Sequence, residues 1–287
     1  MFAVFKREIR AYFQTPAGFI YMGLFLLLTG IYFTFGNLLT GSSFFTDFLG
    51  SILFTYLFVI PLLTMRLFSE EKRQKTDQFL LTNPVSVTSI VCGKFLAATA
   101  VYTGTLLFTV LYAIVIAVYG DLQVWETFGS YIGIIFLGTC YVSLGIFISA
   151  GTENQITAAI ISFFVLLFIW LLDSMIQVIP ADTRTGIISA AVLLAAVLLL
   201  LFINTRNLVI VTGAAIMGAF VITGFYLFYP EIYYGFLQKV LGWFSLNRRY
   251  DAFTMGLLKF DSLVYYASFS FLFLFLTVRK IEKRRWE

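Results

Sequence analysis

Eight runs of apolar residues, each about as long as a lipid bilayer is thick, constrain the fold of this chain most. They lie near residues 17–39, 49–67, 89–119, 129–150, 156–179, 186–204, 207–228 and 261–279. About 20 helical residues cross the hydrocarbon core, because each residue adds about 1.5 Å. With 60% hydrophobic residues in the whole chain, the apolar surface exceeds what a soluble domain can bury. The sequence therefore predicts an all-α, polytopic membrane protein with about eight transmembrane helices.

The basic residues predict the orientation of these spans. If the N-terminus is cytoplasmic, 14 of the 19 Lys and Arg residues fall in inner segments and five in outer segments. The inner ones are Lys6, Arg7, Arg10, Arg66, Lys72, Arg73, Lys75, Lys94, Arg206, Arg279, Lys280, Lys283, Arg284 and Arg285. The positive-inside rule then predicts a multi-pass protein of the bacterial plasma (inner) membrane with both termini cytoplasmic. Since the basic residues lie at the ends of apolar runs, they indicate topology in the lipid bilayer, and no nucleic-acid partner is expected.

Two shorter segments are predicted to lie along the membrane surface. Residues 1–15 place Lys6, Arg7 and Arg10 among apolar residues, which favours an interfacial helix over an unstructured basic leader. Residues 230–260 carry apolar residues at helical spacing, broken by glycines. They are predicted to form short outer, gate-like helices that are re-entrant or interfacial. The alternative is a poorly formed ninth span, and the pair Arg248 and Arg249 argues against it.

Between the second and third apolar runs lies a charged segment, residues 68–86, which is predicted to form a cytoplasmic helix. Glu70, Glu71, Lys72 and Arg73 stand close together in a chain with 12% charged residues. Because a charge at the bilayer centre costs roughly 2.5–3.5 kcal/mol, this segment must lie in water or at the interface. A compact charged helix there suits the docking of a cytoplasmic partner. The alternative is a solvated helix face without a partner.

Three further charged residues lie near the predicted ends of spans. Lys94 is expected at the inner mouth of the third span, with its ammonium group extended to the interface. Asp173 is expected at the outer interface rather than as a translocation ligand. Glu153 either meets a cytoplasmic partner or caps the helix of the fifth span.

The composition also excludes several kinds of chemistry. The chain has no histidine, and both Cys92 and Cys140 fall in apolar spans, so neither a metal site nor a disulfide is expected. It lacks the Gly-x-x-x-x-Gly-Lys-[Ser/Thr] phosphate loop, so we expect no ATP hydrolysis and no catalytic residues in this chain. A channel or secondary transporter usually carries ionisable residues in mid-span, whereas here they cluster at span ends.

The charged segment resembles the cytoplasmic loop of ABC-2 type transporter permeases. The matching residues are Thr64 to Arg73, Thr76, Leu80, Leu81, Thr82, Pro84, Val85, Ser86, Gly93 and Lys94. The resemblance runs from Lys6 to Trp286 and is closest to the branch of the gliding-motility permease and the nitrous-oxide-reductase-maturation permease. Lys75 stands where a glycine is usual in the family, and Gln78 where a glutamate is common. Common members have six spans, so residues 186–228 look like an extra hairpin of two spans.

The resemblance implies a single ABC-2 type transmembrane domain over residues 1–287 and a separate ABC ATP-binding subunit that uses ATP and Mg. This chain itself would bind no cofactor. The coupling helix would contact that subunit through Glu70, Glu71, Lys72, Arg73, Thr76, Leu80, Leu81 and Pro84. Lys6, Arg7, Arg10 and Glu153 would form a secondary cytoplasmic contact.

The resemblance also implies an assembly and an activity. A second permease copy or a related permease would be a partner, and a membrane subunit with a large extracytoplasmic domain is a further candidate. Hydrolysis would drive export or mechanical work across the membrane. The alternative function is a membrane anchor or force-transmitting subunit of a larger envelope complex that moves no solute.

Overall fold

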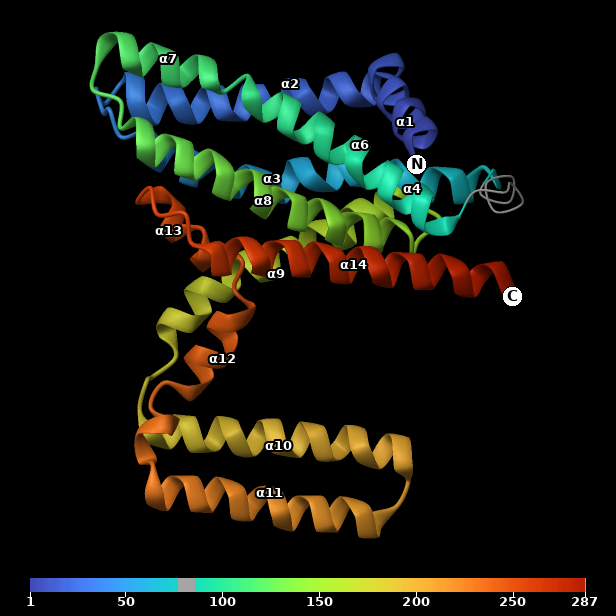
Figure 1. Cartoon of the computed structure of the whole chain (residues 1–287), viewed down its shortest axis with the longest axis vertical. Helices are drawn as coiled ribbons and strands as arrows, with labels where there is room; N and C mark the ends of the chain where they lie inside the picture. The colour runs from blue at the N-terminus through green and yellow to red at the C-terminus, as the bar shows by residue number, and fades with distance from the viewer. Residues whose placement is uncertain (77–85, 287) are drawn as a thin grey trace. The chain divides into compact units, whose positions relative to one another are not determined.

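The computed structural model describes residues 1–76 and 86–286, and the elements in these ranges are helical (Figure 1). Within these described ranges, eight helices are long and apolar enough to cross a membrane. They are Pro16–Leu38, Phe45–Arg73, Val87–Tyr119, Val124–Ser149, Gln155–Val178, Thr183–Ile203, Leu208–Phe228 and Phe260–Lys283. The prediction of an all-α polytopic membrane protein with about eight spans is therefore confirmed.

The chain divides into two compact units, each described here by itself. The first comprises residues 1–168 and 249–287, and the second comprises residues 169–248. The helix α9 (Gln155–Val178) begins in the first unit and ends in the second. The single transmembrane domain over residues 1–287 stays a prediction.

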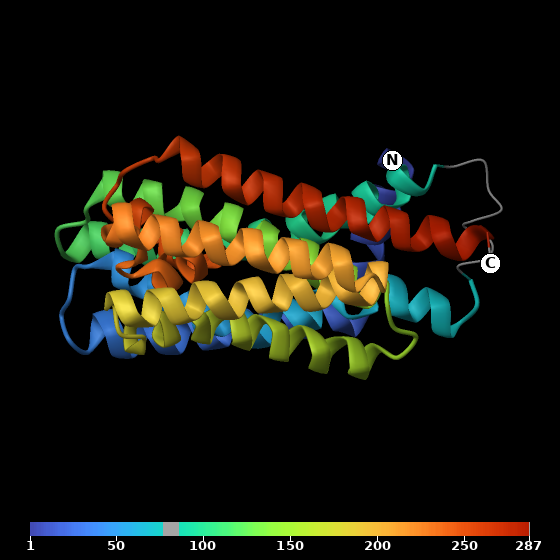
Figure 2. The ribbon, with the colours of Figure 1, turned by 90° about the horizontal axis from the view of Figure 1, so that it is seen from below.

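The first unit is a helical bundle built around α8 (Figures 1 and 2). Its helices are α1 (Phe2–Gln14), α2 (Pro16–Phe33), α3 (Phe45–Thr64), α4 (Arg66–Arg73), α6 (Val87–Leu107), α7 (Val110–Tyr119), α8 (Val124–Ser149), α13 (Asp251–Thr254) and α14 (Phe260–Trp286). A short π-helix, η1 (Thr34–Leu38), follows α2. α8 packs against α3, α14 and α6, and α6 also packs against α1.

Small residues allow α8 to sit this close to its neighbours. A Cβ atom at Gly145 would lie 2.3 Å from the hydroxyl of Thr64 on α3. One at Gly138 would lie 2.2 Å from the ring of Tyr102 on α6. Helices in membranes approach closely at such small residues, because lipid supplies no hydrophobic force to hold them together.

The helix predicted for residues 1–15 is present as α1, so an unstructured leader is wrong. It ends at Gln14, and Pro16 begins α2 at a position where a missing N–H costs little. Tyr12 is buried on one side of α1, whereas Phe2 is largely exposed. Its place at the membrane interface stays a prediction.

In the second unit, α10 (Thr183–Thr205) and α11 (Leu208–Phe228) form the hairpin that residues 186–228 predict. α10 ends at Thr205, and the next residue, Arg206, turns the chain with a φ of 49°. The apolar window of α11 has no buried residue within the structure, as expected of a helix that faces lipid.

Short helical elements follow α11, as residues 230–260 predict. They are η2 (Pro230–Tyr233), α12 (Phe236–Phe244), η3 (Asn247–Arg249) and α13. A ninth span over these residues is therefore wrong. Their location on the outer side of the membrane stays a prediction.

Candidate functional site

The charged segment begins as a direct continuation of the second span. α3 ends at Thr64, and α4 follows after Met65 alone, so apolar and charged residues share one 29-residue helical stretch from Phe45 to Arg73. α4 is strongly amphipathic, with Leu67, Phe68 and Ser69 buried. The charged helix is thus mechanically joined to a transmembrane helix.

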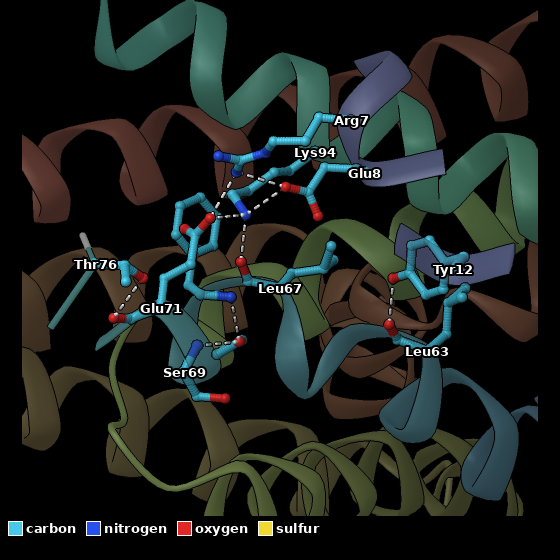
Figure 3. A network of polar contacts seen from close by, with 11 residues as sticks. Arg7, Glu8, Tyr12, Leu63, Leu67, Ser69, Glu71, Thr76 and Lys94 are labelled. Atoms are coloured by element: carbon cyan, nitrogen blue, oxygen red, sulfur yellow. Dashed lines mark hydrogen bonds and ion pairs between the residues drawn. The ribbon is translucent and has the colours of Figure 1, made fainter. Parts of the chain in front are cut away.

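Four charged side chains from α1, α4 and α6 meet on the buried side of α4, and we call them the ion cluster: Arg7, Glu8, Glu71 and Lys94 (Figure 3). The ammonium of Lys94 lies 3.0 Å from a carboxylate oxygen of Glu8 and 3.0 Å from one of Glu71. The guanidinium of Arg7 lies 2.7 Å from the same two carboxylates. Two acids and two bases therefore balance each other where the three helices meet.

Lys94 is the most deeply buried member, with 1% of its side chain exposed. Its ammonium also donates a hydrogen bond of 2.6 Å to the carbonyl oxygen of Leu67 and lies 5.1 Å from the centre of the Phe68 ring. A buried ammonium is tolerated only where acceptors and counter-charges surround it. The prediction that Lys94 reaches the interface is wrong, because its ammonium meets the carboxylates of Glu8 on α1 and Glu71 on α4 instead of lipid head groups.

The environment also fixes the charge of Glu8. Burial opposes its ionisation, but the ammonium of Lys94 and the guanidinium of Arg7 more than offset this, so the pKa of Glu8 lies below its ordinary value. The pKa of Arg7 lies above its ordinary value, because burial is outweighed by its hydrogen bonds and charge attraction to Glu8 and Glu71. Both residues are thus held in their charged forms at neutral pH.

Further polar contacts tie α1 to the junction between α3 and α4. The hydroxyl of Tyr12 donates a 2.6 Å hydrogen bond to the carbonyl oxygen of Leu63 (Figure 3). Arg66 donates to the hydroxyl of Thr15 at 2.6 Å, and its guanidinium lies 4.6 Å from the centre of the Tyr12 ring. The junction is therefore held on its α1 side by contacts that do not involve the ion cluster.

The end of α8 holds α4 from another direction. The hydroxyl oxygen of Ser149 accepts hydrogen bonds from the backbone N–H groups of Phe68 and Ser69, each at 3.2 Å, and donates to the carbonyl oxygen of Met65 at 3.0 Å. Lys72 donates to the carbonyl oxygen of Ala150. These bonds tie the start of α4 to the end of α8.

α4 ends earlier than the sequence predicts. The helix stops at Arg73, and Lys75 adopts a φ of 56° in the left-handed region. The N–H of Thr76 bonds the carbonyl of Glu71 at 2.9 Å, and that of Lys75 bonds the carbonyl of Lys72 at 3.1 Å. This pair of bonds is a Schellman cap, whose left-handed position favours glycine. One helix over 68–86 is therefore wrong, and the left-handed turn gives a physical reason for the glycine usual at this position in the resembling family.

The predicted coupling residues separate into inward and outward groups. Glu71 is 17% exposed and belongs to the ion cluster, Lys72 is half-buried and donates to Ala150, and Arg73 is exposed, as is its neighbour Lys75. On α1, Lys6 and Arg10 are exposed. Glu70 is half-buried. The remaining predicted residues are placed as follows: Arg7 in the ion cluster, Thr76 in the cap, Glu153 exposed in the loop between α8 and α9, and Leu80, Leu81 and Pro84 outside the described residues.

Sequence reasoning missed Glu8, Tyr12 and Ser149, and it assigned Lys94 no partner. Two signals were available. Glu8 is the one acidic residue in the basic segment of residues 1–15, and Lys94 follows seven residues of an otherwise uncharged helix start. Neither signal identifies the partner, since Glu8 and Lys94 are 86 residues apart.

Comparison with known proteins bears on the same region. Residues 43–185 match the model of the family described as ABC-2 family transporter protein. The matched region contains α3, α4, α6, α7, α8 and α9, and therefore Glu71 and Lys94, but not α1. No curated protein matches the chain. Over residues 43–185, just under half of its length, the chain is thus similar to the ABC-2 family of transporter proteins.

Proposed function

We propose that this chain is the transmembrane permease subunit of an ABC transporter, and that a separate ATP-binding subunit docks on the exposed side of α4. One observation carries the proposal: the ion cluster joins α4 to α1 and α6 directly beneath a charged, exposed helix face. The match to the ABC-2 transporter family supports the expectation of an ATP-binding partner. That partner would bind ATP and Mg.

The contacts of α4 provide routes by which movement would reach the membrane. α4 continues α3 along the chain, and Lys94 connects it to α6 through Glu71. Ser149 connects it to α8. A buried polar network whose members are satisfied resists rearrangement. A displacement of α4 would therefore move the second, third and fourth spans together rather than bend α4 alone.

The exposed charges indicate what kind of surface would dock. The ion cluster uses the carboxylates of Glu8 and Glu71 internally, so the outward residues Arg73 and Lys75 leave a basic end on α4. Complementary charge mainly sets orientation and the rate of encounter. We therefore expect an acidic docking surface on the ATP-binding subunit.

The test is copurification of the full-length chain from its native membrane, with mass spectrometry of the proteins it retains. A protein with a phosphate loop should be retained by the wild type and lost with Arg73→Glu and Lys75→Glu together. Lys239→Glu, an exposed lysine on α12, is the matched control and should retain it. Retention of the same protein by the double variant at wild-type level would contradict docking at α4.

The proposed orientation has both termini in the cytoplasm of a bacterial cell. In a background without Cys92 and Cys140, a cysteine at Gln123 should react with a membrane-impermeant thiol reagent added to intact cells. A cysteine at Gln74 should react only after the cells are opened. The reverse pattern would invert the topology and remove α4 from the reach of a cytoplasmic ATP-binding subunit.

A second candidate function is a membrane anchor or force-transmitting subunit of a larger envelope complex. In that case a further membrane subunit, rather than lipid, would cover the exposed apolar surface of α11. A photo-crosslinking residue at Phe220, which is 80% exposed, would distinguish the two functions. Crosslinks to a membrane protein with a large extracytoplasmic domain would support the anchor, and crosslinks to lipid alone would argue against it.

A further inference from the structure

The helix α1 is held at the end of the first span. Thr15, which separates α1 from α2, has an extended backbone with φ −113° and ψ 151°, as favoured for a residue before proline. The chain therefore bends there, and α1 lies at one end of α2 instead of continuing it (Figure 1). The bend is tight, because a Cβ atom at Gly18 would lie 2.1 Å from the carbonyl oxygen of Tyr12. This fixes α1 at the level where the apolar span begins.

Two opposite faces of α1 have different surroundings. Glu8 and Tyr12, four residues apart, are buried against the rest of the first unit. Lys6 and Arg10 are also four residues apart, and both are exposed. At 3.6 residues per turn, this second pair lies on the side of the helix away from the first. Among the described residues, the side chains of Lys6 and Arg10 have no ion-pair or hydrogen-bond partner.

The pair Lys6 and Arg10 therefore carries positive charge that the described part of the protein does not balance. Like charges four residues apart on a helix repel each other and destabilise it slightly. Glu8, the one acidic residue of α1, points inward and contacts Arg7 and Lys94. An anion outside the protein would remove the repulsion between the two exposed bases.

An apolar edge borders these two bases and connects them to the lipid-facing surface. Phe2 and Phe13 are 75% and 49% exposed, and helical spacing places both beside Lys6. The ring of Phe13 makes an edge contact with the ring of Phe19 on α2, with centroids 6.4 Å apart. Phe19 is 57% exposed and begins an open apolar face of the first span that includes Leu27. Because lipid covers such a face, the phenylalanine edge of α1 continues the lipid-covered surface to the two bases.

We propose that α1 binds an anionic phospholipid, with Lys6 and Arg10 contacting the phosphate and Phe2 and Phe13 contacting the acyl chains. Helices that combine bases with exposed aromatic residues bind anionic membranes through both groups. Free phosphate would leave the phenylalanine edge uncovered, so the occupant is a lipid. A zwitterionic lipid brings a cationic group that the two bases repel.

This proposal assigns Lys6 and Arg10 to lipid instead of to an ATP-binding subunit. It requires no second subunit and is tested on the purified chain. Its failure and the failure of the proposed function are therefore separate results.

The experiment measures which lipid lies beside α1 in a bilayer. The full chain carries Cys92→Ala, Cys140→Ala and Ala3→Cys, and a fluorophore is attached at position 3, which is exposed on the side of the two bases. It is placed in nanodiscs that contain phosphatidylglycerol and phosphatidylcholine. In each sample one of the two lipids carries a nitroxide quencher near the glycerol end of an acyl chain. The ratio of quenching at equal mole fraction gives the local enrichment of phosphatidylglycerol.

Phosphatidylglycerol should be enriched beside α1 by roughly fivefold or more at low salt, because each base near an anionic head group contributes about fivefold. Lys6→Gln with Arg10→Gln should reduce the enrichment to within about twofold. High salt should also reduce it, since it screens exposed charges. The charge-conserving exchange Lys6→Arg with Arg10→Lys should keep the enrichment.

The matched control is Lys239→Gln with Lys259→Gln, which removes two exposed bases outside α1 and should leave the enrichment unchanged. The Tm of each variant is measured alongside, and both double glutamine variants should unfold close to the wild type because they change exposed residues.

Four results would overturn the proposal. Equal quenching by the two lipids in the wild type would mean that α1 does not select charge. Enrichment kept in Lys6→Gln with Arg10→Gln would mean that other residues attract the lipid. Enrichment lost in the Lys239→Gln, Lys259→Gln control would mean that net charge selects the lipid. If Lys6→Gln with Arg10→Gln releases a copurified phosphate-loop protein while the enrichment persists, the two bases bind protein instead.

Discussion

Lys94→Met offers the sharpest test of the ion cluster. The change keeps most of the side-chain volume but removes the ammonium that lies 3.0 Å from both Glu8 and Glu71. It also removes the 2.6 Å hydrogen bond to the carbonyl of Leu67. The two carboxylates then share the guanidinium of Arg7 alone, and one negative charge in the cluster is left without a counter-charge.

The expected loss of stability follows from the burial of each partner. Removing one partner of a fully buried ion pair costs about 3–5 kcal/mol. Glu8 and Glu71 retain 11% and 17% side-chain exposure, and Arg7 still contacts both, so the estimate is reduced to about 2–4 kcal/mol. For a chain of this size, that corresponds to a drop in Tm of roughly 5–15 °C.

The assay is thermal unfolding of the purified chain in detergent, with Lys259→Met as the control at an exposed lysine. The control should stay within about 0.5 kcal/mol of the wild type. Adding Glu8→Gln and Glu71→Gln to Lys94→Met should restore part of the loss, because the uncompensated charges disappear. The reasoning about a buried charge balance is wrong if Lys94→Met has the same Tm as Lys259→Met. It is also wrong if the triple variant is no more stable than Lys94→Met.

Three further predictions concern other parts of the first unit. Lys75→Gly should stabilise the protein by about 0.5–1 kcal/mol, measured as a higher Tm, because glycine adopts the left-handed conformation without steric cost; an unchanged or lower Tm would contradict it. Because the pKa of Glu8 is lowered from about 4.5, its stabilising effect is full above that pH and is lost as the pH falls through the lowered pKa. Denaturant titrations should therefore show that the free energy of unfolding declines between pH 6 and about pH 3, and that Glu8→Gln reduces this decline. An equal dependence on pH in the wild type and in Glu8→Gln would refute the prediction. Gly145→Ala should cost about 1–3 kcal/mol, since its Cβ would lie 2.3 Å from the hydroxyl of Thr64; Gly50→Ala on α3, whose Cβ meets nothing within 4 Å, should cost far less in the same unfolding assay.

The sequence alone determined the parts of the fold that depend on local composition. The number of spans follows from the length of the apolar runs, because a helix needs about 20 apolar residues to cross the bilayer. The eight runs correspond to eight such helices in the part of the chain that the structure describes. The helix at residues 1–15 and the hairpin at 186–228 followed in the same way. The position of the charged segment beyond the end of the second span also followed, since the cost of burying charge in lipid is a property of the residues themselves.

The tertiary structure decided which charges are used inside the protein and which are left for a partner. Charge density marks both Glu71 and Arg73 as docking residues, yet ion pairs with Arg7 on α1 and Lys94 on α6 hold Glu71 inward, whereas Arg73 stays exposed. Glu8 and Lys94 pair across 86 residues, and no periodicity or spacing specifies such a contact. The end of α4 at Arg73 depends on a left-handed backbone angle at Lys75, a residue whose side chain disfavours that conformation. Run length and composition are local properties, whereas the ion cluster exists only because three separate helices converge.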